Sequence, residues 1–111
     1  MEYENDESKP MPDGMYGYTV TDRTGSVVEN NGKITNSLHE YVAYINQLGG
    51  LLGASLGFND VEEMVLLGKN RHTICLEVED LHYGAIYKAK SDRHEISQFM
   101  HNKAEENDVL G

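Results

Sequence analysis

The chain has 111 residues, about the size of one globular domain, and carries a formal net charge of −10. Acidic residues gather at its two ends, which leaves the middle nearly balanced and argues against nucleic-acid binding. A single cysteine, Cys75, excludes an intrachain disulfide, and no apolar run approaches the roughly 18 residues that span a bilayer. The first residues lack the basic and apolar blocks of a signal peptide, so we expect a cytoplasmic protein that reaches membranes only through partners and has no direct membrane insertion.

The N-terminal third predicts an acidic tail followed by a β-hairpin. Residues 1–13 are polar and contain two prolines, so we expect them to be a disordered tail. Residues 15–22 alternate larger and smaller side chains with the period of a strand, and residues 23–25 are typical of a turn. A second strand is expected over residues 26–34, with a bulge or second turn at Asn30-Asn31-Gly32.

Residues 36–58 form the most informative stretch, an amphipathic run of helical length. Asn36 or Ser37 is a candidate N-cap. Gly49, Gly53 and Gly57 follow at four-residue spacing and so share one helical face, where another backbone can come close. Each glycine costs about 0.5–1 kcal/mol of helix stability relative to alanine, so we expect a docked partner to offset that cost. The alternative is a helix that ends near Gly49 and continues as a glycine-rich loop.

The second half predicts three strands and a last helix. Residues 61–68 contain Met64-Val65-Leu66-Leu67, which is apolar on both faces and is expected to be a central or covered strand. Strands over residues 72–79 and 83–90 follow, then a helix over residues 93–107 with Asp92 as its cap. This order predicts an α+β domain over residues 14–107, with a five-stranded antiparallel sheet, a long crossover helix and a C-terminal helix. Residues 108–111 are expected to be a short tail.

The sequence contains little that indicates a catalytic or cofactor-binding site. Two of the five histidines, His94 and His101, share a helical face but have no evident third metal ligand. Cys75 is most simply a small packing residue, although a nucleophilic pair with His72 or His82 stays open. No phosphate-binding loop is present, so we predict no catalytic, cofactor or metal residues. The main basic positions are Lys69, Arg71, Lys88, Lys90 and Arg93.

The ordered set of elements resembles the roadblock family. The resemblance rests on residues 17–28, the long helix, residues 61–68 and Thr73-Ile74-Cys75-Leu76, and it covers residues 15 to about 103. That family includes the dynein roadblock light chain, the Ragulator subunits and prokaryotic partners of Ras-like GTPases such as MglB. Its members usually begin with an additional helix, for which the proline-bearing N-terminal stretch leaves no room here, and in this the chain resembles the shorter Ragulator subunits.

The resemblance implies a dimer, formed with itself or with a paralogue through the long helix and the third strand. We expect this interface to contain Tyr41, Ile45, Gly49, Leu52, Gly53, Leu56, Gly57, Met64, Val65, Leu66 and Leu67. The implied function is a non-enzymatic scaffold or regulator of a Ras-like small GTPase, including a role in GTPase activation. A small-ligand sensor of the PAS or GAF type and a dynein-type light-chain adaptor are the alternatives. Tyr16, Tyr18, Tyr83 and Tyr87 could fill or line a sensor's pocket.

Overall fold

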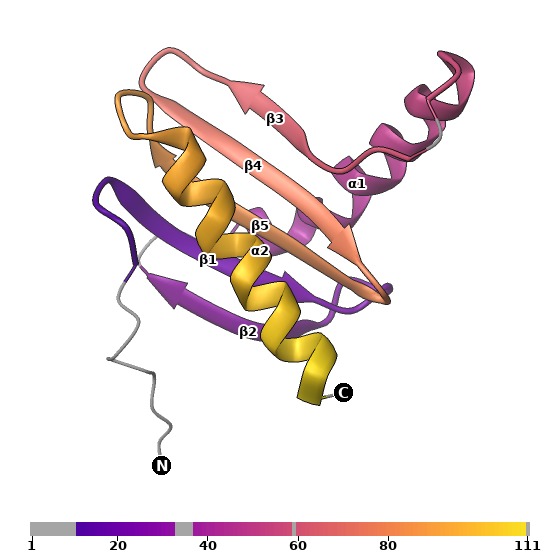
Figure 1. The fold of residues 1–111 in the computed structure, drawn as a ribbon, viewed down its shortest axis with the longest axis horizontal. Helices are drawn as coiled ribbons and strands as arrows, with labels where there is room; N and C mark the ends of the chain where they lie inside the picture. Colours follow the sequence, from indigo (N-terminus) through magenta and orange to yellow (C-terminus); the bar gives the residue numbers. More distant parts are fainter. Residues whose placement is uncertain (1–10, 33–36, 59, 111) are drawn as a thin grey trace.

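The computed structural model describes residues 11–32, 37–58 and 60–110, which form a five-stranded antiparallel sheet between two helices (Figure 1). The elements in chain order are β1 (Met15–Thr21), β2 (Val27–Gly32), α1 (Leu38–Ser55), β3 (Met64–Leu67), β4 (Arg71–Val78), β5 (Leu81–Lys88) and α2 (Arg93–Leu110). The expected element order and sheet are confirmed. The tail expected at residues 1–13 lies largely outside the described residues.

The strand order is β2-β1-β5-β4-β3, so each sheet edge is formed by the strand next to the α1 crossover. α2 crosses the face of the sheet turned toward the viewer in Figure 1, and α1 lies behind it. A strand apolar on both faces is expected in the centre, but β3 is an edge strand of four residues that pairs with β4 alone among the described strands. Of the two expected placements, the central one was therefore wrong, and the described residues do not cover Leu66 and Leu67 of this strand.

The main hydrophobic core lies between the sheet and α2. Its strands contribute alternate residues because side chains two apart share a face. The buried members are Met15, Tyr18, Val20, Ile74, Leu76, Tyr83, Ala85, Tyr87, Ile96, Met100 and Ala104. At the edge of this core, Glu29 of β2 accepts a hydrogen bond from the Tyr18 hydroxyl at 2.6 Å and pairs with Lys103 of α2 at 3.0 Å. This contact ties the β2 edge strand to α2.

The opposite face of the sheet is built from small and polar residues, which lets α1 approach closely. A Cβ atom added to Gly84 of β5 would lie 2.8 Å from Cγ2 of Val42 and 3.5 Å from Cδ2 of Leu38. Thr19, Thr21 and Cys75 are also buried in the protein, in strands β1 and β4. The α1 side of the sheet therefore owes its packing to close backbone approach more than to large apolar side chains.

α1 ends at Ser55, three residues before the expected end. Gly57 has a φ of 87°, in the left-handed region that glycine adopts without strain. The amide of Phe58 donates to the carbonyl of Gly53 at 2.8 Å, and the amide of Gly57 donates to that of Ala54. These two hydrogen bonds form a Schellman motif, so Gly57 stops the helix instead of extending the glycine face.

Other element ends differ in smaller ways. Ser37 precedes α1 but makes no side-chain capping hydrogen bond, and Asn36 lies outside the described residues. The sheet irregularity falls between Val20 and Thr21, opposite Glu29 and Val27, so residue 28 is the bulge and Asn30-Asn31-Gly32 stays in register. α2 continues to Leu110, so the boundary expected at residue 107 lies inside the helix.

Gly49 and Gly53 face their own chain. A Cβ at Gly49 would lie 2.6 Å from Cγ of Met64, the first residue of β3, and a Cβ at Gly53 would overlap Cγ2 of Val61. Both glycines are buried, whereas Gly50 has no atom near an added Cβ. The atoms that come close to the glycine face belong to the side chains of Met64 and Val61, so these two glycines pack against their own chain and do not form an open groove for a partner.

We predict opposite effects for alanine at two glycines of α1. Gly53→Ala should lower the free energy of unfolding, because Val61 must move to admit the methyl group and overpacking costs about 1–3 kcal/mol. Gly50→Ala is the control and should raise it by roughly 0.5–1 kcal/mol, because the site is open and alanine is the better helix former. Denaturant unfolding measures both. Equal stabilisation by the two substitutions would contradict the close approach at Gly53.

Candidate functional site

An exposed apolar surface covers α1, the turn after it, and β3. Among the described residues, nine of the eleven exposed large hydrophobic side chains lie here. We call these nine the α1–β3 surface: Tyr41, Tyr44, Leu48, Leu51, Leu52, Leu56, Phe58, Leu66 and Leu67. Its most exposed members, Leu51 and Leu56, keep 69% and 67% of their surface accessible. On β3, Leu66 shares the α1 face of the sheet with Met64, and Leu67 shares the α2 face with Val65, so the surface extends around the β3 edge. Monomeric proteins rarely leave so many apolar side chains exposed on neighbouring segments, so this is the candidate docking surface.

The periodicity of α1 explains why the surface exists. Val42, Asn46, Gly49 and Gly53 face the sheet at three- and four-residue steps. A second series at the same steps, through Tyr41, Tyr44, Leu48 and Leu51, therefore points away from the sheet and is left exposed by the described residues. The C-terminal turns of α1 also project beyond the β3 edge of the sheet (Figure 1). The helix thus carries its exposed leucines past the strand that bounds the sheet.

The expected interface residues divide between this surface and the interior. Tyr41, Leu52, Leu56, Leu66 and Leu67 are exposed, and Ile45, Met64 and Val65 are partly buried. Gly49 and Gly53 are buried, and Gly57 is exposed after the helix end.

Tyr44, Leu48 and Leu51 belong to the surface but were missed by sequence reasoning. Their three- and four-residue spacing was visible. The regular spacing of the glycines led to the prediction that the glycine face, and not these three residues, is exposed.

A buried polar contact fixes α1 to the sheet. Nδ2 of Asn46 donates to the carbonyl of Leu76 at 2.9 Å and to Nδ1 of His82 at 3.0 Å. Because an amide nitrogen only donates, Nδ1 of the buried His82 accepts, and its imidazole is neutral in this arrangement. Burial lowers the pKa of His82 below its usual 6.5, against the opposing effect of the nearby Glu77 carboxylate. Asn46 and His82 thereby align the helix that carries the exposed apolar residues.

A second polar contact fixes the segment leading into β3. The Glu63 carboxylate accepts a hydrogen bond from the Ser97 hydroxyl and contacts Nε2 of His101 at 2.8 Å, both on α2. Burial raises the pKa of Glu63, but the hydrogen bonds from Ser97 and His101 outweigh it and leave the pKa below its usual value. Because Ser97 and His101 both bind the same carboxylate oxygen, His101 does not activate Ser97 as a nucleophile.

Cys75 is placed for packing and not for chemistry. Its side chain is fully buried, and burial raises the pKa of its thiol to about 12. His82 shares the α1 face of the sheet with Cys75, but its Nδ1 is already bound to Asn46, and His72 stacks edge-on against Tyr87. The nucleophilic pair left open by the sequence is contradicted. Within the described residues, no three potential ligands gather at a possible metal site.

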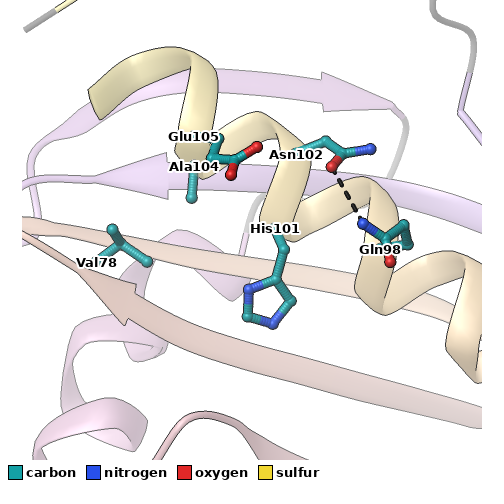
Figure 2. Close-up of a pocket in the computed structure, with 6 residues that line it drawn as sticks. All are labelled: Val78, Gln98, His101, Asn102, Ala104 and Glu105. Atoms are coloured by element: carbon teal, nitrogen blue, oxygen red, sulfur yellow. Dashed lines mark hydrogen bonds between the residues drawn. The ribbon is translucent and has the colours of Figure 1, made fainter. Parts of the chain in front are cut away.

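A shallow hollow of about 240 Å³ lies beside α2 (Figure 2). Val78 of β4 forms one wall, and the rest comes from one side of α2, through Gln98, His101, Asn102, Ala104 and Glu105. Ligand sites usually enclose roughly 300–1,000 Å³ between elements, so this hollow is a poor small-molecule site. The interior between the sheet and α2 is instead filled by the buried Tyr18, Tyr83 and Tyr87.

Comparison with known proteins supports the roadblock/MglB-like fold. No protein-family model and no curated protein sequence matches the chain. Myxococcus xanthus MglB superposes with a TM-score of 0.76 at 15% identity, over 86% of this chain and 82% of that one. A roadblock/LC7 domain from Streptomyces avermitilis gives a TM-score of 0.79 at 13% identity, over 87% and 85%. A structure of MglB with a tetrameric arrangement gives 0.71 at 17% identity, over 82% and 73%. None of the described helices is long and apolar enough to cross a membrane.

The contact between Asn46 and His82 predicts a pH-dependent stability. The unfolded chain binds a proton at His82 more readily than the folded chain does, so the free energy of unfolding should fall as the pH drops below about 6.5. His82→Gln keeps a polar side chain but does not titrate, so its stability should fall less steeply between pH 6.5 and 5. His94→Gln, at an exposed position of α2, is the control and should follow the wild type. Denaturant unfolding at a series of pH values measures these slopes, and parallel slopes for wild type and His82→Gln would contradict the burial of a neutral imidazole.

Proposed function

We propose that this chain is a non-enzymatic roadblock-type module that dimerises through the α1–β3 surface and acts as a scaffold or regulator of a Ras-like small GTPase. The observation that carries the proposal is the exposed apolar surface on α1 and β3. Its nine exposed large apolar side chains lie on neighbouring segments, as the apolar centre of an interface that buries about 800 Å² per partner requires.

The chemistry of the surface favours a second copy or a paralogue as partner. α1 carries one charged residue, Glu40 in its first turn, and β3 carries none, so the surface offers little charge that would repel its own image. β3 is an edge strand, and pairing it with its equivalent would join two five-stranded sheets while the α1 helices pack together. A two-fold arrangement of this kind is the commonest form of homo-oligomer. The tetrameric arrangement of the similar MglB adds support for self-association in this fold.

The GTPase role rests on the resemblance to the roadblock family and on the fold shared with MglB. The sequence has no phosphate-binding loop, so a GTPase partner would hold the nucleotide. A scaffold or a co-regulator of GTP hydrolysis then acts by contact with the surface of that partner, and the chain needs no catalytic group of its own. The two polar contacts at His82 and Glu63 serve this role by fixing the position of α1 and β3.

We predict that the protein is a dimer and that introducing charged residues into the α1–β3 surface dissociates it into monomers. Light scattering should give twice 12.5 kDa for the wild type at tens of micromolar. Leu51→Glu combined with Leu66→Glu should give 12.5 kDa, because a buried carboxylate without a partner is strongly unfavourable in an interface. A paralogue partner would show itself as a wild-type monomer that becomes a heterodimer when that paralogue is added.

Val28→Glu is the matched control for this experiment. Val28 is an exposed apolar residue of β2, at the opposite edge of the sheet from β3, so its replacement should leave the mass at the wild-type value. A wild-type monomer that binds no paralogue would remove the basis for the proposal. Dissociation by Val28→Glu as well would place the interface elsewhere.

We also predict a complex with a Ras-like GTPase from the same organism. Candidate GTPases loaded with GDP or a non-hydrolysable GTP analogue are mixed with the dimer, and complex formation and GTP hydrolysis are measured. The complex should depend on the bound nucleotide and should weaken at least tenfold with Leu51→Glu/Leu66→Glu, because a scaffold that loses its dimer loses its composite surface. Equal binding to all nucleotide states, or none to any candidate, counts against GTPase regulation but leaves the dimer untouched.

A further inference from the structure

Five of the nine lysine and arginine residues meet at one end of the sheet. We call this group the basic end: Lys69 in the β3–β4 loop, Arg71 and Lys88 at the facing ends of β4 and β5, Lys90 in the β5–α2 loop, and Arg93 at the start of α2. Figure 1 shows these two loops and the start of β1 at the same, upper left end of the molecule. Segments far apart in the sequence thus bring their positive charges together.

Backbone hydrogen bonds hold the basic end in place. The amide of Ala89 donates to the carbonyl of Asn70 at 3.0 Å, and the amide of Lys88 donates to the carbonyl of Gly14 at 2.8 Å. Arg71 lies opposite Lys88 in the sheet, and its guanidinium sits 4.7 Å from the centre of the Tyr16 ring. The two loops and the start of β1 therefore form one fixed frame for these cations.

The positive charges of the basic end have no ion-pair partner among the described residues. In contrast, Lys103 pairs with Glu29 at 3.0 Å, and Arg23 lies 3.9 Å from Asp80. The carboxylates on the same segments are those of Asp13, Asp92 and Glu95, and Glu63 lies close enough to Arg93 to interact with it electrostatically, so five cations face four anions in a chain whose net charge is −10. A local excess of positive charge on so acidic a chain selects a negatively charged partner.

We propose that the basic end is a docking surface for an acidic peptide segment and that its occupant is the segment 1–10 of this same chain. That segment contains Glu2, Glu4, Asp6 and Glu7 against Lys9, which leaves a net charge of −3 on its side chains. It joins the described chain at Met11, which packs against the core, three residues before the Gly14 carbonyl that binds Lys88. The complementary charges are therefore tethered beside each other. This proposal uses a different surface from the proposed dimer and does not depend on it.

Because residues 1–10 are covalently joined to the domain, even a weak contact is sufficient for them to occupy the basic end. Ten extended residues reach roughly 33 Å, so the length of the segment does not prevent the contact. A short flexible connection gives an effective concentration in the millimolar range, so an affinity too weak to detect between separate molecules can fill the site within one chain. Exposed ion pairs are screened over about 8 Å at physiological salt, so the contact should weaken as salt rises. In this arrangement an acidic segment of another protein must compete with residues 1–10.

The test measures how well the full chain binds a fluorescent peptide of ten glutamates, by anisotropy at low salt. Glu2→Gln, Glu4→Gln, Asp6→Asn and Glu7→Gln, combined in one variant, should raise the affinity for the probe at least threefold over the wild type, because the basic end is then vacant. A charge-matched control neutralises four exposed glutamates elsewhere, Glu40, Glu62, Glu79 and Glu105, each to Gln. The control should raise the affinity distinctly less, since it changes the net charge alone.

A second pair of variants tests whether the probe binds at the basic end. In the background with the neutral segment, Lys88→Gln/Lys90→Gln should reduce probe binding at least fivefold, whereas Arg23→Glu, which lowers the net charge by the same two units at the other end of the sheet, should change it less than twofold. Equal gains from the two neutralised variants would overturn the proposal. Probe binding to the wild type as tight as to the neutral-segment variant would also overturn it, because the basic end would then be open to acidic segments of other proteins.

Discussion

The close passage of residues 61–64 beneath α1 is the constraint on which the rest of the structure depends. Gly49 and Gly53 remove the side chains that would keep Met64 and Val61 away from the helix. Each glycine weakens the helix by about 0.5–1 kcal/mol, and the close packing offsets that cost. Because these inward positions are occupied by glycines, the bulky residues of α1 point outward. The same choice of residues therefore seats β3 and creates the exposed apolar surface.

Two polar contacts fix the positions of α1 and of the segment before β3. Close packing of small residues against a sheet leaves the helix free to slide, whereas Asn46 has a fixed pair of partners in Leu76 and His82. Glu63 does the same for the segment before β3 by binding Ser97 and His101 of α2. Buried hydrogen bonds add modest net stability but penalise every alternative alignment that leaves a polar group unpaired. The position of the candidate docking surface is thus set by contacts on both faces of the sheet.

Local sequence patterns predicted the type and order of the helices and strands, but not which residues pack against each of them. Alternation in residues 15–22 and 72–79 and the apolar period of residues 38–52 depend on neighbouring residues, so the order of strands and helices could be predicted. Gly57 was misread because four-residue spacing describes both a glycine face and a helix stop, and only the left-handed backbone distinguishes them. The face of α1 that packs on the sheet was predicted wrongly because neither face of the helix carries a run of charged residues. The contact between Asn46 and His82 joins residues 36 positions apart, which no periodicity encodes.

The two edges of the sheet are not equivalent, and this limits how far sheets could join. β3 offers an uncharged edge, whereas β2 carries a bulge at residue 28 and is tied through Glu29 to Lys103 and Tyr18. Bulges and charges are the features by which natural edge strands avoid pairing with other chains. A molecule with one receptive edge and one protected edge ends its growth after a single pairing. Such a chain can therefore expose an apolar strand without becoming the seed of a fibre.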